Sequence, residues 1–436
     1  MPHVIPFRGL LYANPDPDAM SRVLAPPFDM IGPAEQAALF ATDAHNIAHV
    51  TLPPKDTDPD YAAAGARFRA WREDETVRPD ADQAFYVYEQ TRDVDGAQVK
   101  LLGFIGAVAL DNDEATDVYG HENIFPGPVA DRVKLTRQTK CRLEPVLATY
   151  VDVSARIEAI LETVTAGEPI FSTTLVADAS HRLWRMTDPE QQAAVQAILA
   201  SGPVVIADGH HRSAGARAYR EAMRAEGLVT ADSPCNYTMM LLAEARTSRL
   251  LCGPFHRVVH RLPEEIDLAQ LGAQLGPTVS LSPVPTDGLS DAEIATDIVD
   301  TIARQGVDAP TFGCRWTGGA AIVTITDLDG LLASAELEMT ETTKAFDVAL
   351  LHRLIFKPRF GLTGEFGPRE SNVTFEENPV RAWQAVDAGA AMAWFVNPAR
   401  TEDVIAAALA GEKVPQKGTH FFPKPPSGMV LYDLSD

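Results

Sequence analysis

Short apolar runs alternate with amphipathic segments along most of the chain. The apolar runs, which are typical of strands, are residues 48–52, 85–88, 101–110, 146–151, 173–176, 183–186, 204–206, 237–243, 320–326, 331–339 and 393–396. Helical spacing or helix-start signals mark residues 33–41, 61–71, 129–139, 155–165, 187–200, 346–355, 379–388 and 402–410. The alternation predicts an α/β protein of the α+β type with mixed sheets, including hairpins around Asp95-Gly96 and Asp329-Gly330.

The most distinctive segment lies in the middle of the chain, where a buried strand runs into a helix. Residues 204–206 are the apolar strand, and the Ala- and Arg-rich run after Arg212 predicts the helix. Between them stands Asp208-Gly209-His210-His211-Arg212. A tight turn of this kind aims backbone N–H groups at one point, and the helix dipole adds partial positive charge there. The segment predicts a site for a small anion, with a phosphoryl group as the leading candidate.

Each residue of this turn has a property suited to such a site. Gly209 lets the backbone approach a ligand closely, and Arg212 can fork onto a phosphate. His210, His211 and Asp208 add capacity for proton transfer or metal binding. The alternative is a helix start capped by Asp208, with both histidines satisfied by hydrogen bonds. Five consecutive ligand-competent residues exceed what a cap requires, which favours the site.

The composition narrows the choice of partner and compartment. A net charge of −23 over 436 residues repels nucleic-acid backbones and anionic membranes. The chain opens without a secretory signal, and its longest strongly apolar run, residues 101–110, is too short to span a bilayer. Four cysteines lie far apart, as is typical of reduced thiols. We expect a cytoplasmic protein that acts on a small molecule, without nucleic-acid or membrane partners; its oligomeric state stays open.

Two other segments carry polar residues in proline-rich surroundings. His121 and Glu122 follow an apolar strand, and either can act as a base or bind a divalent ion, with Arg132 shortly after them. Lys417 and Lys424 can hold phosphate as point charges, or their segment is a clasp whose aromatic residues pack on the core. An N-terminal arm with Arg8 and Asp29 is either structural or part of the pocket wall.

A change in the pattern of residue types after Cys252 indicates two domains with a boundary near Leu250. Residues 1–250 form an α/β domain that carries the anion site, and residues 251–436 form a second α/β domain with the C-terminal clasp. The sequence contains no P-loop, dinucleotide fingerprint, nucleophile elbow or zinc-protease helix. No common nucleotide-binding, hydrolase or protease motif therefore supports one of those functions.

Several motifs occur in an order that resembles a known family. They are Pro6-Phe7-Arg8-Gly9, Ala25-Pro26-Pro27-Phe28-Asp29, His121-Glu122, Asp131-Arg132, Ile206-Ala207-Asp208-Gly209-His210-His211-Arg212, Asn397-Pro398 and Pro415-Gln416-Lys417-Gly418-Thr419. Together they resemble the bacterial domain-of-unknown-function family 1015 over nearly the whole chain. This resemblance specifies the family but carries little function.

The central turn also resembles a motif of the ParB/sulfiredoxin-like superfamily, which includes free-serine kinases with a similar Asp-Gly-x-His-Arg turn. The resemblance implies a ParB/sulfiredoxin-like core with additional α/β elaborations. It assigns Asp208, Gly209, His211 and Arg212 to phosphate binding or transfer. His210 stands where sulfiredoxin has its catalytic cysteine, which disfavours sulfinic-acid repair. The acidic charge disfavours the DNA binding of ParB proteins.

These observations lead to a phosphotransferase that uses ATP or ADP with Mg²⁺ on a small hydroxylated metabolite, free serine being the first candidate. Glu122, Asp208, His210 and His121 are the expected catalytic residues, with Glu122 and Asp208 also the expected Mg²⁺ ligands. Gly209, His211, Arg212, Arg132 and Lys417 are expected to bind phosphate or nucleotide. The alternatives are a nucleotide- or phosphometabolite-binding regulator without turnover, and a phosphatase or other hydrolase that uses the same anion site.

Overall fold

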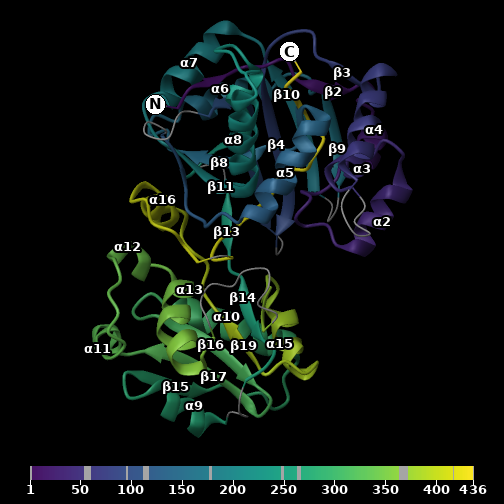
Figure 1. Ribbon diagram of the computed structural model, residues 1–436. Helices are drawn as coiled ribbons and strands as arrows, with labels where there is room; N and C mark the ends of the chain where they lie inside the picture. The colour runs from purple at the N-terminus through teal and green to yellow at the C-terminus, as the bar shows by residue number, and fades with distance from the viewer. Residues whose placement is uncertain are drawn as a thin grey trace. The chain divides into compact units, whose positions relative to one another are not determined.

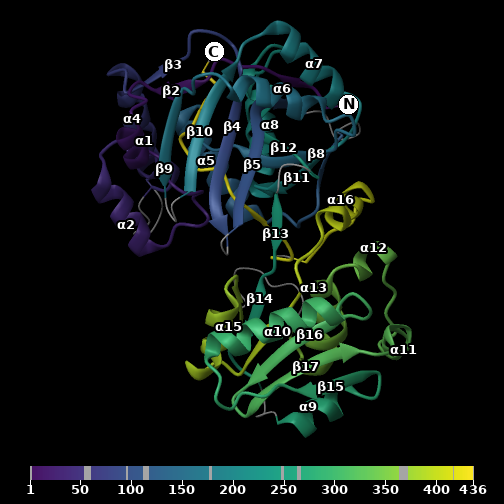
Figure 2. The same ribbon diagram turned by 180° about the vertical axis from the view of Figure 1, so that it is seen from behind.

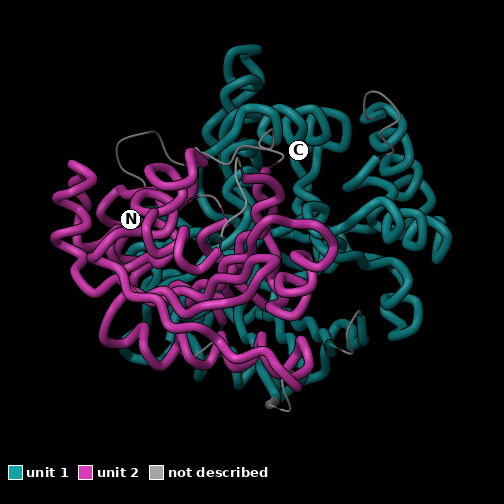
Figure 3. Tube along the Cα trace, turned by 90° about the horizontal axis from the view of Figure 1, so that it is seen from below, with its two compact units in different colours: residues 1–120, 124–250, 423–436 teal, residues 121–123, 251–422 magenta. Residues whose placement is uncertain are grey.

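The computed structural model describes residues 2–53, 60–94, 97–110, 117–175, 179–246, 250–262, 267–362, 372–415 and 417–435. The chain divides into two compact units (Figure 3): unit 1 comprises residues 1–120, 124–250 and 423–436, and unit 2 comprises residues 121–123 and 251–422. The expected domains, residues 1–250 and 251–436, differ from the two units at residues 121–123, which belong to unit 2, and at residues 423–436, which belong to unit 1. A domain boundary near residue 250 stays a prediction.

Unit 1 is built around a large mixed sheet with helices on both faces (Figure 1). Its strands are β1 (Val4–Ile5), β2 (Leu10–Tyr12), β3 (Val77–Pro79), β4 (Phe85–Val94), β5 (Ala97–Ala109), β6 (Val118–Gly120), β7 (Cys141–Arg142), β8 (Val146–Tyr150), β9 (Phe171–Leu175), β10 (Ala179–Met186), β11 (Val204–Asp208), β12 (Tyr237–Glu244) and β21 (Tyr432–Asp433). Its helices are α1 (Pro17–Val23), α2 (Pro33–Thr42), α3 (Ala48–Thr51), α4 (Tyr61–Glu73), α5 (Pro126–Thr139), α6 (Arg156–Thr165), α7 (Pro189–Leu199), α8 (His210–Ala225) and the 3₁₀ turn η2 (Pro234–Asn236).

The main sheet of unit 1 has the order β6-β11-β8-β12-β5-β4-β10-β9, with β1 also pairing with β5. The β6–β11 and β8–β12 pairs are parallel, and the remaining pairs are antiparallel. Apolar residues of α6 and α7, such as Ile157 and Val195, pack with Phe85, Phe104 and Trp184 on one face. Helix α8 lies across β8 and β12 and packs against α5 (Figure 1).

Unit 2 contains a smaller antiparallel sheet with the order β15-β17-β16-β19-β14-β18. Helices α10 and α15 supply its core through residues such as Ile298 and Trp383, which meet Ile322 and Phe395 of the sheet. Its strands are β13 (Leu251–Gly253), β14 (His256–Val259), β15 (Val279–Pro283), β16 (Thr311–Trp316), β17 (Gly319–Ile325), β18 (Val373–Glu376), β19 (Met392–Phe395) and β20 (His420–Phe422). Its helices are α9 (Leu268–Leu275), α10 (Asp291–Gln305), α11 (Leu328–Ser334), α12 (Glu341–Lys344), α13 (Asp347–Leu350), the π-helical turn η3 (Leu351–Phe356), α14 (Lys357–Phe360), α15 (Pro379–Asp387) and α16 (Thr401–Leu409).

The α/β class with mixed sheets is therefore confirmed. The hairpin of β4 and β5 is antiparallel as expected, although its Asp95-Gly96 turn lies outside the described residues. The strand predicted at residues 48–52 is wrong: residues 48–51 form helix α3, and the Asn46 side chain accepts from the Ala48 N–H at 2.9 Å just before it. An apolar run of this length cannot show a period that separates strand from helix.

The strand predicted at residues 331–339 is also wrong. Asp327 accepts a hydrogen bond from the Gly330 N–H at 2.8 Å and caps helix α11, so the Asp329-Gly330 pair lies in the first turn of a helix. The same residue types occur in hairpin turns and in helix starts, which explains the error.

Candidate functional site

The central turn is sharper than the sequence suggests. Strand β11 continues through Asp208, and helix α8 starts at His210, so only Gly209 separates them. The pairing of β11 with β8 shifts register between Ile206 and Asp208, a bulge of the kind that re-aims a side chain. Gly209 has a φ of 91°, and a Cβ added to it would lie 2.8 Å from Arg212 Nε. Glycine is thus required both by the backbone conformation and by the close approach of Arg212.

Asp208 is the centre of a charge cluster in unit 1. Arg212 donates to Asp208 from Nη2 at 2.5 Å, and Lys424 Nζ lies 2.7 Å from the other carboxylate oxygen. Arg212 also donates from Nη1 to the carbonyl of Pro145 at 2.5 Å. The three side chains are 17%, 8% and 10% exposed for Asp208, Arg212 and Lys424. Asp208 therefore forms ion pairs, and Gly209, which has no side-chain cap, occupies the position before the helix.

The two cations set the protonation of this carboxyl. Burial pushes the pKa of Asp208 upward, but the charges of Lys424 and Arg212 outweigh burial and lower its pKa to about 2. Burial likewise lowers the pKa of Lys424, and Asp208 and Asp29 reverse that effect so that the pKa is raised. Asp208 is consequently ionised throughout the physiological range, which makes it a fixed negative charge and a weak base.

The two histidines of the turn have different surroundings. His211 Nε2 accepts a hydrogen bond from the Phe125 N–H at 3.1 Å, and its ring stacks on Phe125 at a centroid distance of 5.9 Å. An accepting Nε2 belongs to the neutral imidazole, so His211 positions the residue that precedes α5. His210 is buried, and its ring lies against Gly120 at the end of β6.

Arg132 lies on α5, within the same unit as the turn. Its guanidinium donates to Asp131 and stacks over the Phe28 ring at 3.8 Å. Arg132 and Arg212 both line a small cavity of about 40 Å³. That volume holds water but not a nucleotide. The structure therefore brings two of the predicted phosphate ligands to one cavity, each already held by a carboxylate.

Three further predicted residues, His121, Glu122 and Lys417, belong to unit 2. His121 donates to or accepts from Thr419 at 2.9 Å through Nε2, and Lys417 Nζ lies 4.8 Å from the centre of the Phe255 ring. Glu122 is in the same unit. A site that combines His121, Glu122 or Lys417 with the β11–α8 turn stays a prediction.

Metal binding has no preassembled site in the described part of the chain. Within those residues, no group of three or more His, Cys, Asp or Glu side chains is placed to hold an ion. Magnesium commonly binds through one or two carboxylates together with substrate phosphates. Both carboxylate oxygens of Asp208 already pair with Arg212 and Lys424, so the Mg²⁺ roles expected of Glu122 and Asp208 stay predictions.

Sequence reasoning did not find the role of Glu144. It is buried, and it accepts from the Phe28 N–H at 3.0 Å and from Ser427 Oγ at 2.5 Å. Burial lowers the pKa of Arg212, but the charge of Asp208 and, after it, that of Glu144 outweigh burial and raise the pKa. Lys424 was recognised as a cation, but nothing in its Pro-rich segment indicates a pairing with Asp208. Both residues reach the site through long-range packing, which leaves no local sequence signal.

A known protein family matches most of this chain. The chain belongs to a family of proteins of unknown function, DUF1015, whose model matches residues 4–349. Among curated proteins, none matches this chain. No helix within the described residues has the length and apolar character needed to cross a membrane.

Several solved structures show a weak likeness. A mutant free serine kinase in complex with ADP has a TM-score of 0.34 and 11% identity, covering 70% of this chain and 84% of its own. SbnI with a C-terminal truncation from Staphylococcus aureus has a TM-score of 0.36 and 10% identity, covering 73% and 82%. A conserved hypothetical protein from Pyrococcus furiosus has a TM-score of 0.32 and 9% identity, covering 71% and 90%. At these scores the likeness carries no argument, and the ParB/sulfiredoxin-like core stays a prediction.

Proposed function

We propose that the β11–α8 turn of unit 1 binds the phosphate groups of ATP or ADP. On this proposal the protein is a phosphotransferase acting on a small hydroxylated metabolite, with free serine as the first candidate. One observation carries the proposal: a left-handed glycine starts a long helix directly after a buried strand, and two cations, Arg212 and Lys424, lie beside that start. Phosphoryl transfer depends mainly on positioning and on charge stabilisation, which these groups are suited to provide.

The proposal gives Asp208 a different role from the one that its position suggests. Because the pKa of Asp208 is about 2, it is a poor general base, and we assign it to holding Arg212 and Lys424 in place. Each cation has further N–H donors beyond the one it gives Asp208, so a phosphate can bridge them. The proposal assigns no base for the substrate proton within the turn, and a magnesium ion would enter with the nucleotide.

The second candidate is a nucleotide- or phosphometabolite-binding regulator without turnover. The ionised state of Asp208 favours this candidate. Among the described residues of unit 1, the turn then offers cations that can bind an anion, but its carboxylate is too weak a base to accept a substrate proton. A hydrolase with the same anion site is a third candidate, and no contact of the turn distinguishes it from the first.

Binding and turnover are tested in one series. Calorimetry with ATP and ADP should show binding to the full chain, and Lys424→Gln should weaken it about tenfold to a hundredfold, the worth of a charged hydrogen bond. Lys140→Gln, which removes an exposed lysine of the same unit, is the matched control. Incubation with ATP or ADP and a pool of hydroxylated metabolites, read by mass spectrometry, should yield a phosphorylated product.

The outcomes separate the candidates. Binding without a product supports the regulator, and metabolite dephosphorylation supports the hydrolase. Absence of nucleotide binding by the wild-type protein, or equal affinity in Lys424→Gln and Lys140→Gln at matched melting temperatures, contradicts the anion site.

A further inference from the structure

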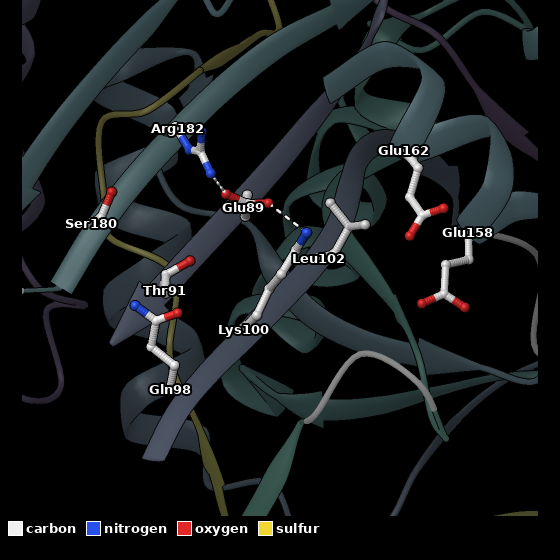
Figure 4. A pocket seen from close by; sticks show the side chains of 9 residues that line it. All are labelled: Glu89, Thr91, Gln98, Lys100, Leu102, Glu158, Glu162, Ser180 and Arg182. Carbon is white, nitrogen blue, oxygen red and sulfur yellow. Dashed lines mark hydrogen bonds and ion pairs between the residues drawn. The ribbon is translucent and has the colours of Figure 1, made fainter. Parts of the chain in front are cut away.

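A second concave site lies on the main sheet of unit 1, on strands that do not take part in the β11–α8 turn. It is a cavity of about 710 Å³ formed by β4, β5, β10 and α6 (Figure 4). Figure 2 looks onto this side of the sheet, where the strands extend beyond the end covered by α6. The volume is within the range of small-molecule sites. Nothing in the proposed phosphotransfer requires this cavity.

The cavity arises because one face of the sheet changes from apolar to polar residues along the strands. Phe85 and Val87 of β4 belong to the core beneath α6 and α7, and the next residue on that face is Glu89. Arg182 of β10 and Leu102 of β5 are the cross-strand partners of Glu89. In the following row, Thr91 aligns with Lys100 on one side and with Ser180 on the other. An apolar face is thus continued by two rows that contain charges and hydroxyl groups.

One end of the cavity carries an excess of positive charge. Glu89 is 4% exposed, and its carboxylate pairs with Lys100 at 2.8 Å and with Arg182 through the other oxygen. Each cation is nearly half exposed, at 45% for Lys100 and 43% for Arg182. A buried carboxylate between two cations is suited to fix their heads side by side at the cavity wall, where together they leave one net positive charge.

The other end carries negative charge. Glu158 and Glu162 lie one turn apart on α6 and both line the cavity (Figure 4). Neither of them forms an ion pair with any residue that the structure describes. Leu102 lies between the two ends in Figure 4 and provides an apolar middle. Two like charges one turn apart repel each other, and a bound cation would relieve that repulsion.

From this arrangement we infer that the cavity binds a zwitterion whose two charges are separated by a short chain, with a short peptide as the ligand class. The carboxylate of the peptide meets Lys100 and Arg182, and its ammonium group meets Glu158 and Glu162. The apolar side chain between them covers Leu102. A tripeptide in extended form spans roughly 10 Å, which separates its two charges far more than a single amino acid does.

The test is calorimetric titration of the full chain with the tripeptide Gly-Leu-Gly, its N-acetylated form, its C-terminal amide and free serine. We expect the unmodified tripeptide to bind at least about tenfold more tightly than the other three, because each of them lacks one charge or the separation between charges. The double variant Glu158→Gln/Glu162→Gln should lose about tenfold to a hundredfold in affinity for the tripeptide. Glu168→Gln, which removes an exposed carboxylate just beyond the same helix, should bind like the wild type.

A second variant tests the positive end. Lys100→Gln leaves Arg182 to pair with Glu89, so the fold should be kept. It should weaken binding of the tripeptide and leave the weak binding of its amide unchanged. The inference is overturned if the wild-type protein binds none of the four probes, if the modified forms bind as tightly as the tripeptide, or if the double variant binds like Glu168→Gln. Nucleotide binding at the β11–α8 turn should be the same in all these variants, so failure here is distinct from failure there.

Discussion

Asp208 in unit 1 and Asp347 in unit 2 are both largely withdrawn from solvent, but the groups that contact them differ. Asp208 lies between the side chains of Arg212 and Lys424. Asp347 accepts from the backbone N–H of Asn397 at 3.1 Å and from its side-chain amide at 3.0 Å. Within the described residues, no cation pairs with Asp347.

The consequence is a large difference in protonation. Burial raises the pKa of Asp347 to about 6, because the two neutral donors of Asn397 offset the effect of burial only in part. Two cations overcome the same effect at Asp208 and lower its pKa to about 2. The partners, rather than burial, therefore decide whether a buried carboxyl serves as a fixed charge or as a group that titrates. Asp208 belongs to the first kind, which supports the proposal that it holds Arg212 and Lys424 in place.

The largest expected effect on stability follows from removing the fixed negative charge of Asp208. Asp208→Ala leaves the buried Arg212 without its carboxylate and leaves Lys424 with only Asp29, at 3.8 Å, and we expect unit 1 to lose about 3–5 kcal/mol of its free energy of unfolding. Hydrogen exchange read by mass spectrometry reports opening free energies segment by segment, and should place the loss in unit 1. A change below about 1 kcal/mol would show that the ion pairs give no net stability.

The second expected effect is a pH dependence confined to unit 2. The pKa of Asp347 in the folded chain, about 6, is above its value in the unfolded chain, about 4, so the unfolded state releases this proton first. Stability is therefore lost as the pH rises through this window, by roughly 3 kcal/mol in full. Asp347→Asn should remove that loss and be more stable than the wild type at neutral pH. Hydrogen exchange near pH 4 and pH 7 on both proteins measures it, and a parallel dependence in the two proteins would contradict the assignment.

The smallest effect compares two glycines of the left-handed region. Gly209 has a φ of 91° and would place a Cβ against Arg212, whereas Gly411 in unit 2 has a φ of 73° with nothing within 4 Å among the described residues. Gly411→Ala should cost about 1 kcal/mol from the backbone alone. Gly209→Ala should cost about 2–3 kcal/mol, because it also displaces Arg212 from Asp208. If urea unfolding shows that the two variants lose the same free energy of unfolding, the close approach of Arg212 to Gly209 is unimportant.

The sequence predicted much of the fold where its signals are local. The strand at residues 204–206, the helix capped by Asp188 and the hairpin of β4 and β5 follow from periodicity and turn residues alone. Residues 48–52 and 331–339 were assigned to the wrong class, because helices α3 and α11 lie there. The side chains of Asn46 and Asp327 accept from backbone N–H groups in the first turn of these helices. Such local contacts compete with β propensity at positions where the apolar pattern is too short to decide.

The site was predicted less completely. The turn itself is visible in the sequence because its ligand-competent residues are consecutive. Its charge balance is not, since Lys424 and Glu144 come from distant segments and their proximity depends on how the chain packs. The second cavity was not predicted at all. Glu89, Lys100 and Arg182 are ordinary strand residues in the sequence, and only the register of three strands brings them into one cluster.

The division of unit 1 into separate stretches of chain affects the order in which it can be completed during synthesis. Lys424 and strand β21, which pairs with β7, follow all of residues 251–422 in the chain. A ribosome that adds about 5–20 residues per second needs roughly 10–35 s for that interval. During this time Asp208 and Arg212 lack Lys424, and strand β7 lacks its pairing partner β21. Unit 1 is begun first and finished last, so a nascent chain holds an incomplete Asp208–Arg212–Lys424 cluster until unit 2 has been made.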